Sequence, residues 1–195
     1  EKLGAKVNES EEGYVVLAKA GKLRGTNIFL RMPSVTGAQT LMMAAVLAKG
    51  KTIIKNAPLE PETKSFADFL NSCGAKIKGA GTATIEITGT GLLSARGKAY
   101  ITPSDRIEAG SFLILGALAG DKLEIKNCNP EDFEALIETL NYCGVEMEIG
   151  KNNMVVSAKN GADYVASDIK THEYPGFPTD LQAPMVVFLN QALGE

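Results

Sequence analysis

The stretch "LNSCGAKI", Leu70 to Ile77, decides the fold because it returns as "LNYCGVEM", Leu140 to Met147. A weaker copy, "EKLGAKV", opens the chain. The glycines of the three copies are Gly4, Gly74 and Gly144, which stand 70 residues apart. A fixed period of this kind indicates a repeated supersecondary unit. The sequence therefore predicts a fold built by duplication.

Each repeat alternates helical and β-rich stretches. Residues 61–74 and 129–144 have acidic residues in the first turn and a glycine at the end, which is typical of helices. Between the expected helices lie short β-rich stretches at residues 51–56, 82–89, 98–103, 122–127 and 153–159. One unit therefore runs strand, helix, strand, helix and two more strands (βαβαββ), and the chain holds about two and a half units. The pattern predicts a mixed α/β (α+β) fold.

Three further helices are expected to begin in the same way. Each start has a proline, then Ser or Thr, then an apolar stretch: "PSVTG" from Pro33, "PSDRIE" from Pro103 and "PTDLQ" from Pro178. Ser and Thr are favoured N-caps because the side-chain oxygen accepts from a free backbone N–H. The candidate N-caps are Ser34, Ser104 and Thr179, with Thr179 and Gln182 as a capping box, and Asp105 with Glu108 as an alternative cap.

One carboxylate stands out at these helix starts. In "HEYPGFPTDLQAP", residues 172–184, Asp180 follows two prolines and a glycine that restrict the backbone. A helix start suits anions such as phosphate, and an aspartate there stays ionised and able to accept a proton. Thr36 and Gly37 at the first start would let a ligand approach closely. The other interpretation is that Asp105 and Asp180 only cap their helices.

Composition narrows the function classes. The chain has 195 residues, of which 45% are hydrophobic, and a net charge of −3 that gives no reason to expect a nucleic-acid surface. It has one histidine, so a multi-histidine metal cluster is excluded. The apolar runs are far shorter than the roughly 20 residues that span a bilayer. Of the three cysteines, which fit a reducing cytoplasm, Cys73 and Cys143 are expected in the core and Cys128 is expected to be partly exposed.

The repeat also leads to an expectation about the two ends of the chain. Gly4 would close a helix like those closed by Gly74 and Gly144, but only three residues precede it. The chain stops just after Gly194, before the strand that the repeat would place next. We expect the chain to be an internal fragment of a longer protein.

Four stretches carry a resemblance to a known family. They are "PSVTGAQTLMMAAVLAKGKTIIKNAPLEPE", "FADFLNSCGAKIKGAGTATIEITG", "PSDRIEAGSFL" and "YPGFPTDLQAP", in this order. Together they resemble the UDP-N-acetylglucosamine 1-carboxyvinyltransferases, a branch of the enolpyruvyl transferase family. The resemblance implies six βαβαββ units in two lobes, an inverse α/β barrel that is incomplete here, with the active site between the lobes. It also implies transfer of the enolpyruvyl group from phosphoenolpyruvate to the 3-hydroxyl of UDP-N-acetylglucosamine, which begins peptidoglycan precursor synthesis.

The resemblance also assigns residues. The aspartate of "FPTD", here Asp180, takes the proton from the sugar hydroxyl in the family. The stretch Met32, Pro33, Ser34 and Val35, followed by Thr36 and Gly37, binds the nucleotide part. A family lysine is replaced by Met32, and the neighbouring Arg31 is a hypothetical substitute. Residues 1–104 correspond to part of the lobe that carries the catalytic loop, and residues 105–195 to part of the second lobe.

The implied reaction needs no metal or organic cofactor, and its partners are the two small-molecule substrates, without nucleic acid or membrane. The protein is expected in the cytoplasm. The family's loop cysteine or aspartate, its Lys-Asn pair and its later arginines fall outside the chain, so the chain alone is expected to be inactive.

Two alternatives stay open. One is the shikimate-pathway enolpyruvyl transferase, which "YPGFPTD" disfavours. The other is a non-catalytic ligand-binding repeat module. RNA 3′-phosphate cyclases share the broad repeat, but the near-neutral charge counts against RNA.

Overall fold

The chain forms two compact units, Glu1–Thr102 (unit 1) and Pro103–Glu195 (unit 2). The computed structural model describes residues 1–18, 22–95, 97, 99–119, 121–159 and 163–194. Each unit has its own hydrophobic core, so each is described by itself. No helix in the described ranges is long and apolar enough to cross a membrane.

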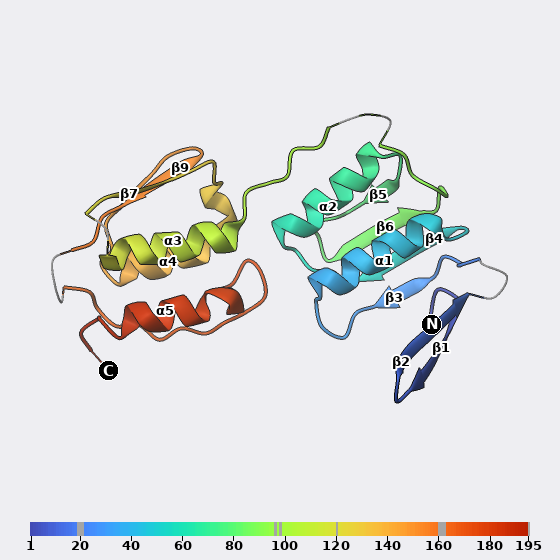
Figure 1. Ribbon diagram of the computed structural model, residues 1–195, viewed down its shortest axis with the longest axis horizontal. Helices are drawn as coiled ribbons and strands as arrows, with labels where there is room; N and C mark the ends of the chain where they lie inside the picture. Colours follow the sequence, from blue (N-terminus) through green and yellow to red (C-terminus); the bar gives the residue numbers. More distant parts are fainter. Residues whose placement is uncertain (19–21, 96, 98, 120, 160–162, 195) are drawn as a thin grey trace. The chain divides into compact units, whose positions relative to one another are not determined.

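Unit 1 holds a complete βαβαββ unit. Its elements are β3 (Asn27–Phe29), α1 (Val35–Leu47), β4 (Lys51–Lys55), α2 (Pro61–Ser72), β5 (Lys76–Lys78) and β6 (Thr84–Thr88). The sheet order is β3-β4-β6-β5, in which β3 is parallel to β4 and the other pairs are antiparallel. Both helices cover one face of this sheet (Figure 1). The core of unit 1 lies between the helices and the sheet and includes Met42, Ile54, Ile85 and Ile87.

Unit 2 repeats most of this order. Its elements are α3 (Arg106–Ala119), β7 (Leu123–Lys126), the 3-10 helix η2 (Pro130–Phe133), α4 (Glu134–Tyr142), β8 (Met147–Ile149), β9 (Asn153–Val156), the 3-10 helix η3 (Thr179–Leu181) and α5 (Gln182–Leu189). The sheet β7-β9-β8 has the same order as β4-β6-β5 and the same antiparallel pairing. Helix α5 packs beside α3 (Figure 1). The predicted duplication is confirmed.

The repeated "CG" stretches end their helices in the same way. Gly74 and Gly144 have φ angles of 105° and 86°, a backbone conformation that glycine adopts without strain. The N–H of Ala75 donates to the Leu70 carbonyl (3.0 Å), and the N–H of Val145 donates to the Leu140 carbonyl (2.9 Å). Together with the bonds from the Gly74 and Gly144 N–H groups to the Asn71 and Asn141 carbonyls, these are Schellman motifs. At these motifs the chain passes from α2 into the edge strand β5 and from α4 into the edge strand β8.

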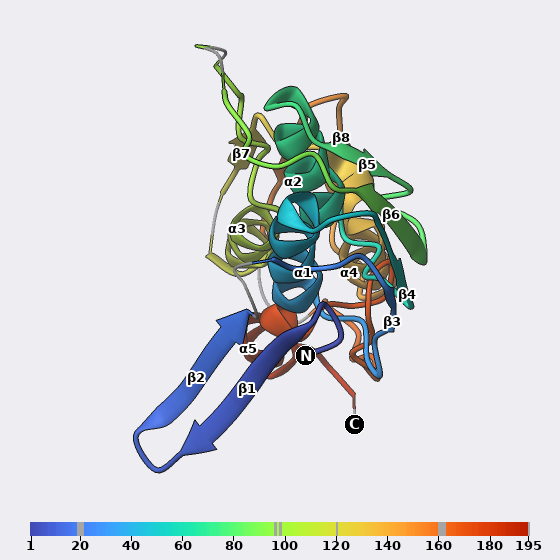
Figure 2. The same ribbon diagram turned by 90° about the vertical axis from the view of Figure 1, so that its right-hand side faces the viewer.

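A β-hairpin was not predicted. Strands β1 (Ala5–Ser10) and β2 (Gly13–Ala18) pair antiparallel and extend away from the sheet of unit 1 (Figure 2). They follow Gly4, as β5 and β6 follow Gly74 and β8 and β9 follow Gly144. The hairpin is therefore a third copy of the same strand pair. Its alternation of apolar and polar residues is too weak to have identified it.

The strand predicted at residues 98–103 is wrong for the described part of that stretch. Residues 99–102 belong to no strand, and Lys98 lies outside the described residues. This stretch is rich in residues that favour strands, but Tyr100 makes its contacts with a helix instead of a strand. Its hydroxyl donates to the Ser65 carbonyl oxygen of α2 (2.8 Å). Tertiary contact overrides strand propensity here.

Candidate functional site

Helix α1 begins as the sequence predicts. Ser34 is the N-cap in extended conformation (φ −133°, ψ 115°), and its Oγ accepts from the Gly37 N–H at 3.2 Å. A Cβ at Gly37 would lie 2.9 Å from that Oγ, so a larger residue there would require the Ser34 side chain to shift. The predicted cap is confirmed. Gly37 therefore has a structural role in addition to any ligand contact.

The residues before this helix start are open to solvent. Met32 is 70% exposed, Arg31 and Ser34 are exposed, and Pro33 and Val35 are half-buried. Among the described residues, Arg31 has no ion-pair partner. A free guanidinium beside a helix N-terminus is a favourable place for an anionic group such as phosphate.

Helix α3 begins with Asp105 as its cap. The Asp105 carboxylate accepts from the N–H groups of Ile107 (2.8 Å) and Glu108 (3.0 Å). The alternative cap is confirmed for the Asp105 side chain, but the described residues show no return hydrogen bond to the Glu108 side chain, and the prediction of Ser104 is wrong. A carboxylate oxygen binds two free N–H groups and also faces the positive end of the helix dipole, so Asp105 is favoured over Ser104.

The "PGFPTD" loop is fixed by apolar anchors at both ends. Phe177 and Leu181 are buried in the core of unit 2, with 6% and 0% exposure. The N–H of His172 donates to the Phe177 carbonyl (2.9 Å), and the N–H of Gly176 donates to the Glu173 carbonyl (2.8 Å). A Cβ at Gly176 would come within 2.6 Å of the His172 Cβ, so only glycine fits. The loop has little freedom on either side of Asp180.

Asp180 lies in η3 and is exposed. Within the described part of the chain, its carboxylate forms no hydrogen bond or ion pair. The predicted capping box of Thr179 and Gln182 is wrong, because neither η3 nor α5 has a side-chain cap and Leu181 is the N-cap residue of α5. Asp180 is thus an unpaired carboxylate on a rigid loop.

Helix α3 supports this loop. The guanidinium carbon of Arg106 lies 5.4 Å from the centre of the Tyr174 ring, within cation–π range. A Cβ at Gly110 would lie 2.8 Å from a Leu181 methyl group, so the glycine makes room for the Leu181 anchor. The stretches "DRIEAG" and "YPGFPTD" are therefore in contact within unit 2. The sequence reasoning missed Arg106, Tyr174 and Leu181 as supports, although the apolar residue directly after Asp180 is a usable signal.

The three cysteines are not candidate nucleophiles. All are buried, and desolvation raises the pKa of the Cys128 and Cys143 thiols. The prediction of core positions for Cys73 and Cys143 is confirmed. The prediction of partial exposure for Cys128 is wrong, because this residue is only 3% exposed. The described residues contain no group of three or more His, Cys, Asp or Glu side chains that could hold a metal ion.

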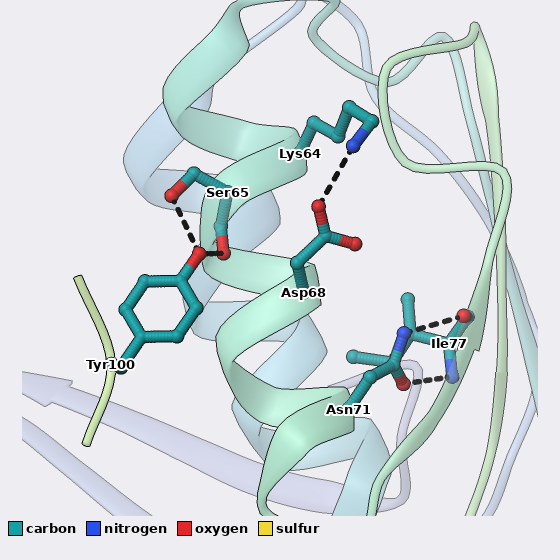
Figure 3. A network of polar contacts seen from close by, with 6 residues as sticks. All are labelled: Lys64, Ser65, Asp68, Asn71, Ile77 and Tyr100. Atoms are coloured by element: carbon teal, nitrogen blue, oxygen red, sulfur yellow. Dashed lines mark hydrogen bonds and ion pairs between the residues drawn. The ribbon is translucent and has the colours of Figure 1, made fainter. Parts of the chain in front are cut away.

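A hollow of about 420 Å³ lies at the edge of the unit 1 sheet and contains no predicted site residue. It is lined by Lys51, Asn71, Ala75, Lys76, Ile77, Lys78, Glu86 and Thr88. Asn71 closes the edge strand, since its amide donates to the Ile77 carbonyl (2.9 Å) and accepts from the Ile77 N–H (2.8 Å; Figure 3). Lysines on an edge strand also prevent edge-to-edge pairing, which accounts for the charge of the hollow.

The structure distributes the predicted site residues over both units. Met32, Pro33, Ser34, Val35, Thr36 and Gly37 lie at the start of α1 in unit 1, and Asp180 lies in unit 2. The first set offers free N–H groups and a nearby cation. The second offers a carboxylate without a partner. Anion binding and proton acceptance are the chemistry that these two groups can perform.

Comparison with known proteins gives consistent matches. Residues 1–193 match the family model of EPSP synthase (3-phosphoshikimate 1-carboxyvinyltransferase). The chain is 43% identical over 194 residues to UDP-N-acetylglucosamine 1-carboxyvinyltransferase of Solibacter usitatus. It is 44% identical over 194 residues to UDP-N-acetylglucosamine 1-carboxyvinyltransferase 2 of Listeria monocytogenes. Both alignments cover 100% of this chain but only 46% and 44% of the relatives, so the chain spans less than half of their length.

A solved structure supports the fold. The enolpyruvyl transferase NikO from Streptomyces tendae matches with a TM-score of 0.82, over 98% of this chain and 47% of that chain. The sequence identity of 20% limits this match to the fold. The predicted fold class, repeated βαβαββ units without a closed barrel in the described residues, is confirmed.

Proposed function

The chain belongs to the EPSP synthase family, and from this premise we propose that its protein transfers the enolpyruvyl group of phosphoenolpyruvate to the 3-hydroxyl of UDP-N-acetylglucosamine. The relatives that are more than 40% identical carry the name of that activity. The shikimate-pathway reaction is the second candidate, because the matching family model is described by it. Both candidates are enolpyruvyl transfers, and they differ in the acceptor.

The state of Asp180 is the observation that carries the proposal. A general base must be ionised, reachable and free of partners that would hold its charge. Asp180 is exposed and has no hydrogen bond among the described residues, on a loop whose neighbours Phe177 and Leu181 are buried. Such a carboxylate can take the proton of the sugar hydroxyl without first breaking another contact. Fixing it within a fraction of an ångström increases the rate, because misplacement of a catalytic group is costly.

The binding role falls to the start of α1. In the proposal, residues Met32 to Gly37 hold the nucleotide part of the acceptor, with the free N–H groups of the helix start facing anionic oxygens. Arg31 takes the place of the family lysine, because its exposed guanidinium can pair with a phosphate. Residues 1–104 then form part of the binding lobe that carries the catalytic loop, and residues 105–195 form part of the lobe with the base.

The reaction balances without a cofactor. The hydroxyl oxygen forms a bond to C2 of phosphoenolpyruvate as its proton passes to Asp180, and the methylene carbon takes up a proton to give a tetrahedral intermediate. Loss of a methyl proton and cleavage of the bond between C2 and the phosphate oxygen then release inorganic phosphate and leave the enolpyruvyl group on the sugar oxygen. No residue of this chain is assigned as the acid at the methylene carbon. The activity would place the protein in the cytoplasm, in cell-wall synthesis that supports cell shape and division.

The test is phosphate release from phosphoenolpyruvate by the complete protein that carries this chain. Release should depend on UDP-N-acetylglucosamine, and Asp180→Asn should lower turnover by about 10²–10⁴-fold, the range for loss of a general base. The 195-residue chain alone should release no phosphate. Circular dichroism of the variant controls for folding.

The alternatives predict other outcomes. Release that depends on shikimate 3-phosphate instead would assign the second acceptor. Full turnover by a folded Asp180→Asn protein would remove Asp180 from the mechanism and leave the family activity intact. A folded complete protein that binds UDP-N-acetylglucosamine but releases no phosphate with either acceptor would be a ligand-binding repeat module.

A further inference from the structure

The segment that joins the two units follows unit 1 up to Tyr100. If the two repeats are aligned on Pro33 and Pro103, Tyr100 occupies the position of Leu30, which follows β3 and donates its N–H to the Lys55 carbonyl of β4 (3.0 Å). A strict repeat would therefore place Tyr100 beside the sheet of unit 2. The described residues 99–102 form no strand, and within the described part of the chain the sheet of unit 2 has three strands where that of unit 1 has four.

Tyr100 is instead held on α2 by three contacts. Its hydroxyl donates to the Ser65 carbonyl oxygen (2.8 Å) and lies 3.0 Å from the Ser65 hydroxyl oxygen (Figure 3). Its ring meets the Phe69 ring edge to face, with centroids 5.2 Å apart. Ser65 and Phe69 are one helical turn apart, so the ring and the hydroxyl bind the same face of α2. The tyrosine thus uses both parts of its side chain, the hydroxyl for a hydrogen bond and the ring for an apolar contact.

The next fixed point along the chain is Asp105. Its carboxylate caps α3 through the N–H groups of Ile107 and Glu108. Between the two anchors lie Ile101, Thr102, Pro103 and Ser104, all exposed, with Ile101 at 90%. We call these four residues the interunit linker. Pro103 restricts its backbone further, because the ring fixes φ.

We propose that Tyr100 is a positioning residue: its attachment to α2 sets the point from which the chain leaves unit 1 and keeps the interunit linker at four residues. A linker of four residues extends over at most about 14 Å. Among the described residues before Tyr100, the nearest with a backbone hydrogen bond is Ser94, whose N–H donates to the Cys73 carbonyl (3.1 Å). Loss of the Tyr100 contacts would lengthen the linker at its unit 1 end, at most to residues 95–104.

The consequence follows from chain length. The r.m.s. end-to-end distance of a flexible linker grows with the square root of its length, so an increase from four to at most ten residues should raise it by up to about 1.6-fold. The effective concentration of one unit at the other falls by up to about four-fold, as the −3/2 power of the linker length. On the proposed function, residues of both units act on one substrate molecule, so the linker would affect turnover. The distance measurement below does not depend on that function.

The experiment measures the distance distribution between two spin labels in the 195-residue chain. The labels are attached at Lys55→Cys in unit 1 and Glu138→Cys in unit 2, both exposed positions, and the three native cysteines are buried. Tyr100→Ala should widen the distribution, because a longer linker spans a larger r.m.s. distance. Tyr100→Phe, which keeps the ring contact with Phe69 and loses the hydroxyl, should give a smaller widening. Tyr142→Ala, at an exposed tyrosine on α4, is the matched control and should change nothing.

Hydrogen exchange of the α2 amides shows whether unit 1 stays folded in each variant. A widened distribution with unchanged α2 protection supports the proposal. An unchanged width in a folded Tyr100→Ala chain overturns it, as does a widening of the same size in Tyr142→Ala. If Tyr100→Ala lowers the hydrogen-exchange protection of the α2 amides, only the Tyr100→Phe variant tests the proposal. An unchanged width of the distance distribution in Tyr100→Phe then overturns it. Failure of phosphate release by the complete protein would refute the proposed function but leave this result in place.

Discussion

Two helix starts in unit 2 have nearly the same sequence and are held in different ways. Both consist of proline, Ser or Thr, and aspartate, at Pro103–Asp105 and Pro178–Asp180. At the first, the carboxylate of Asp105 binds two backbone N–H groups, and the following residue is the half-buried Arg106. At the second, the carboxylate binds no described group, and the following residue, Leu181, is fully buried.

The difference shows how a fold can leave a polar group free. A helix start needs something to fix it, either a side chain that satisfies free N–H groups or an apolar residue buried beside it. Asp105 does the first, with its Oδ1 accepting from both N–H groups. Leu181 does the second, so Asp180 is not needed for stability. A carboxylate that the fold does not use can be used by a reaction.

The largest effect on stability is expected from the apolar anchor. Leu181→Ala removes a fully buried side chain that packs against Gly110 and should lower the free energy of unfolding by about 2–5 kcal/mol. Urea denaturation of the chain measures this change. Val187→Ala on α5, where the side chain is 58% exposed, is the control and should cost far less. Equal losses in the two variants would show that Leu181 is not an anchor.

Much of this arrangement could be predicted from the sequence. The repeat gave the order of helices and strands, because glycine with positive φ ends each second helix at a fixed place. The cap of α1 at Ser34 followed from local chemistry. The resemblance of "PGFPTD" pointed to Asp180. These features depend on neighbours within a few residues, and such neighbours are visible in a sequence.

The rest depends on contacts between distant residues. The apolar Leu181 is visible beside Thr179, but the space that lets it replace a capping box is made by Gly110 on another helix. Nothing near Tyr100 indicates that its segment binds Ser65 instead of pairing as a strand. Cys128 was expected to be partly exposed because a strand ends before it, but the core of unit 2 covers it. Long-range packing decided each of these cases.

A smaller effect is expected from the capping carboxylate. Asp105→Ala leaves two N–H groups of α3 without their acceptor and should lower the free energy of unfolding by about 1 kcal/mol. Ser104→Ala, one residue earlier, should stay within about 0.5 kcal/mol, since Ser104 is exposed and is not the cap. Thermal unfolding of the two variants side by side tests the assignment. A larger loss from Ser104→Ala would reverse it.

The smallest effect on stability is expected at Asp180. Asp180→Ala should change the free energy of unfolding by less than about 0.5 kcal/mol, because the carboxylate is exposed and holds no described group. The same variant should abolish most turnover in the complete protein, on the proposed function. Urea denaturation of Asp180→Ala beside Asp105→Ala measures the contrast directly.

Either result at Asp180 has a physical meaning. If Asp180→Ala costs as much stability as Asp105→Ala, the carboxylate is a cap after all, and loss of turnover could then come from a displaced loop. If the cost is near zero while turnover falls, the loss belongs to the chemistry, because Leu181 and Phe177 still hold the loop in place. Asp105 and Asp180, at equivalent positions, would then differ in role because the residue after Asp180, Leu181, is buried and fixes the helix start without a capping carboxylate.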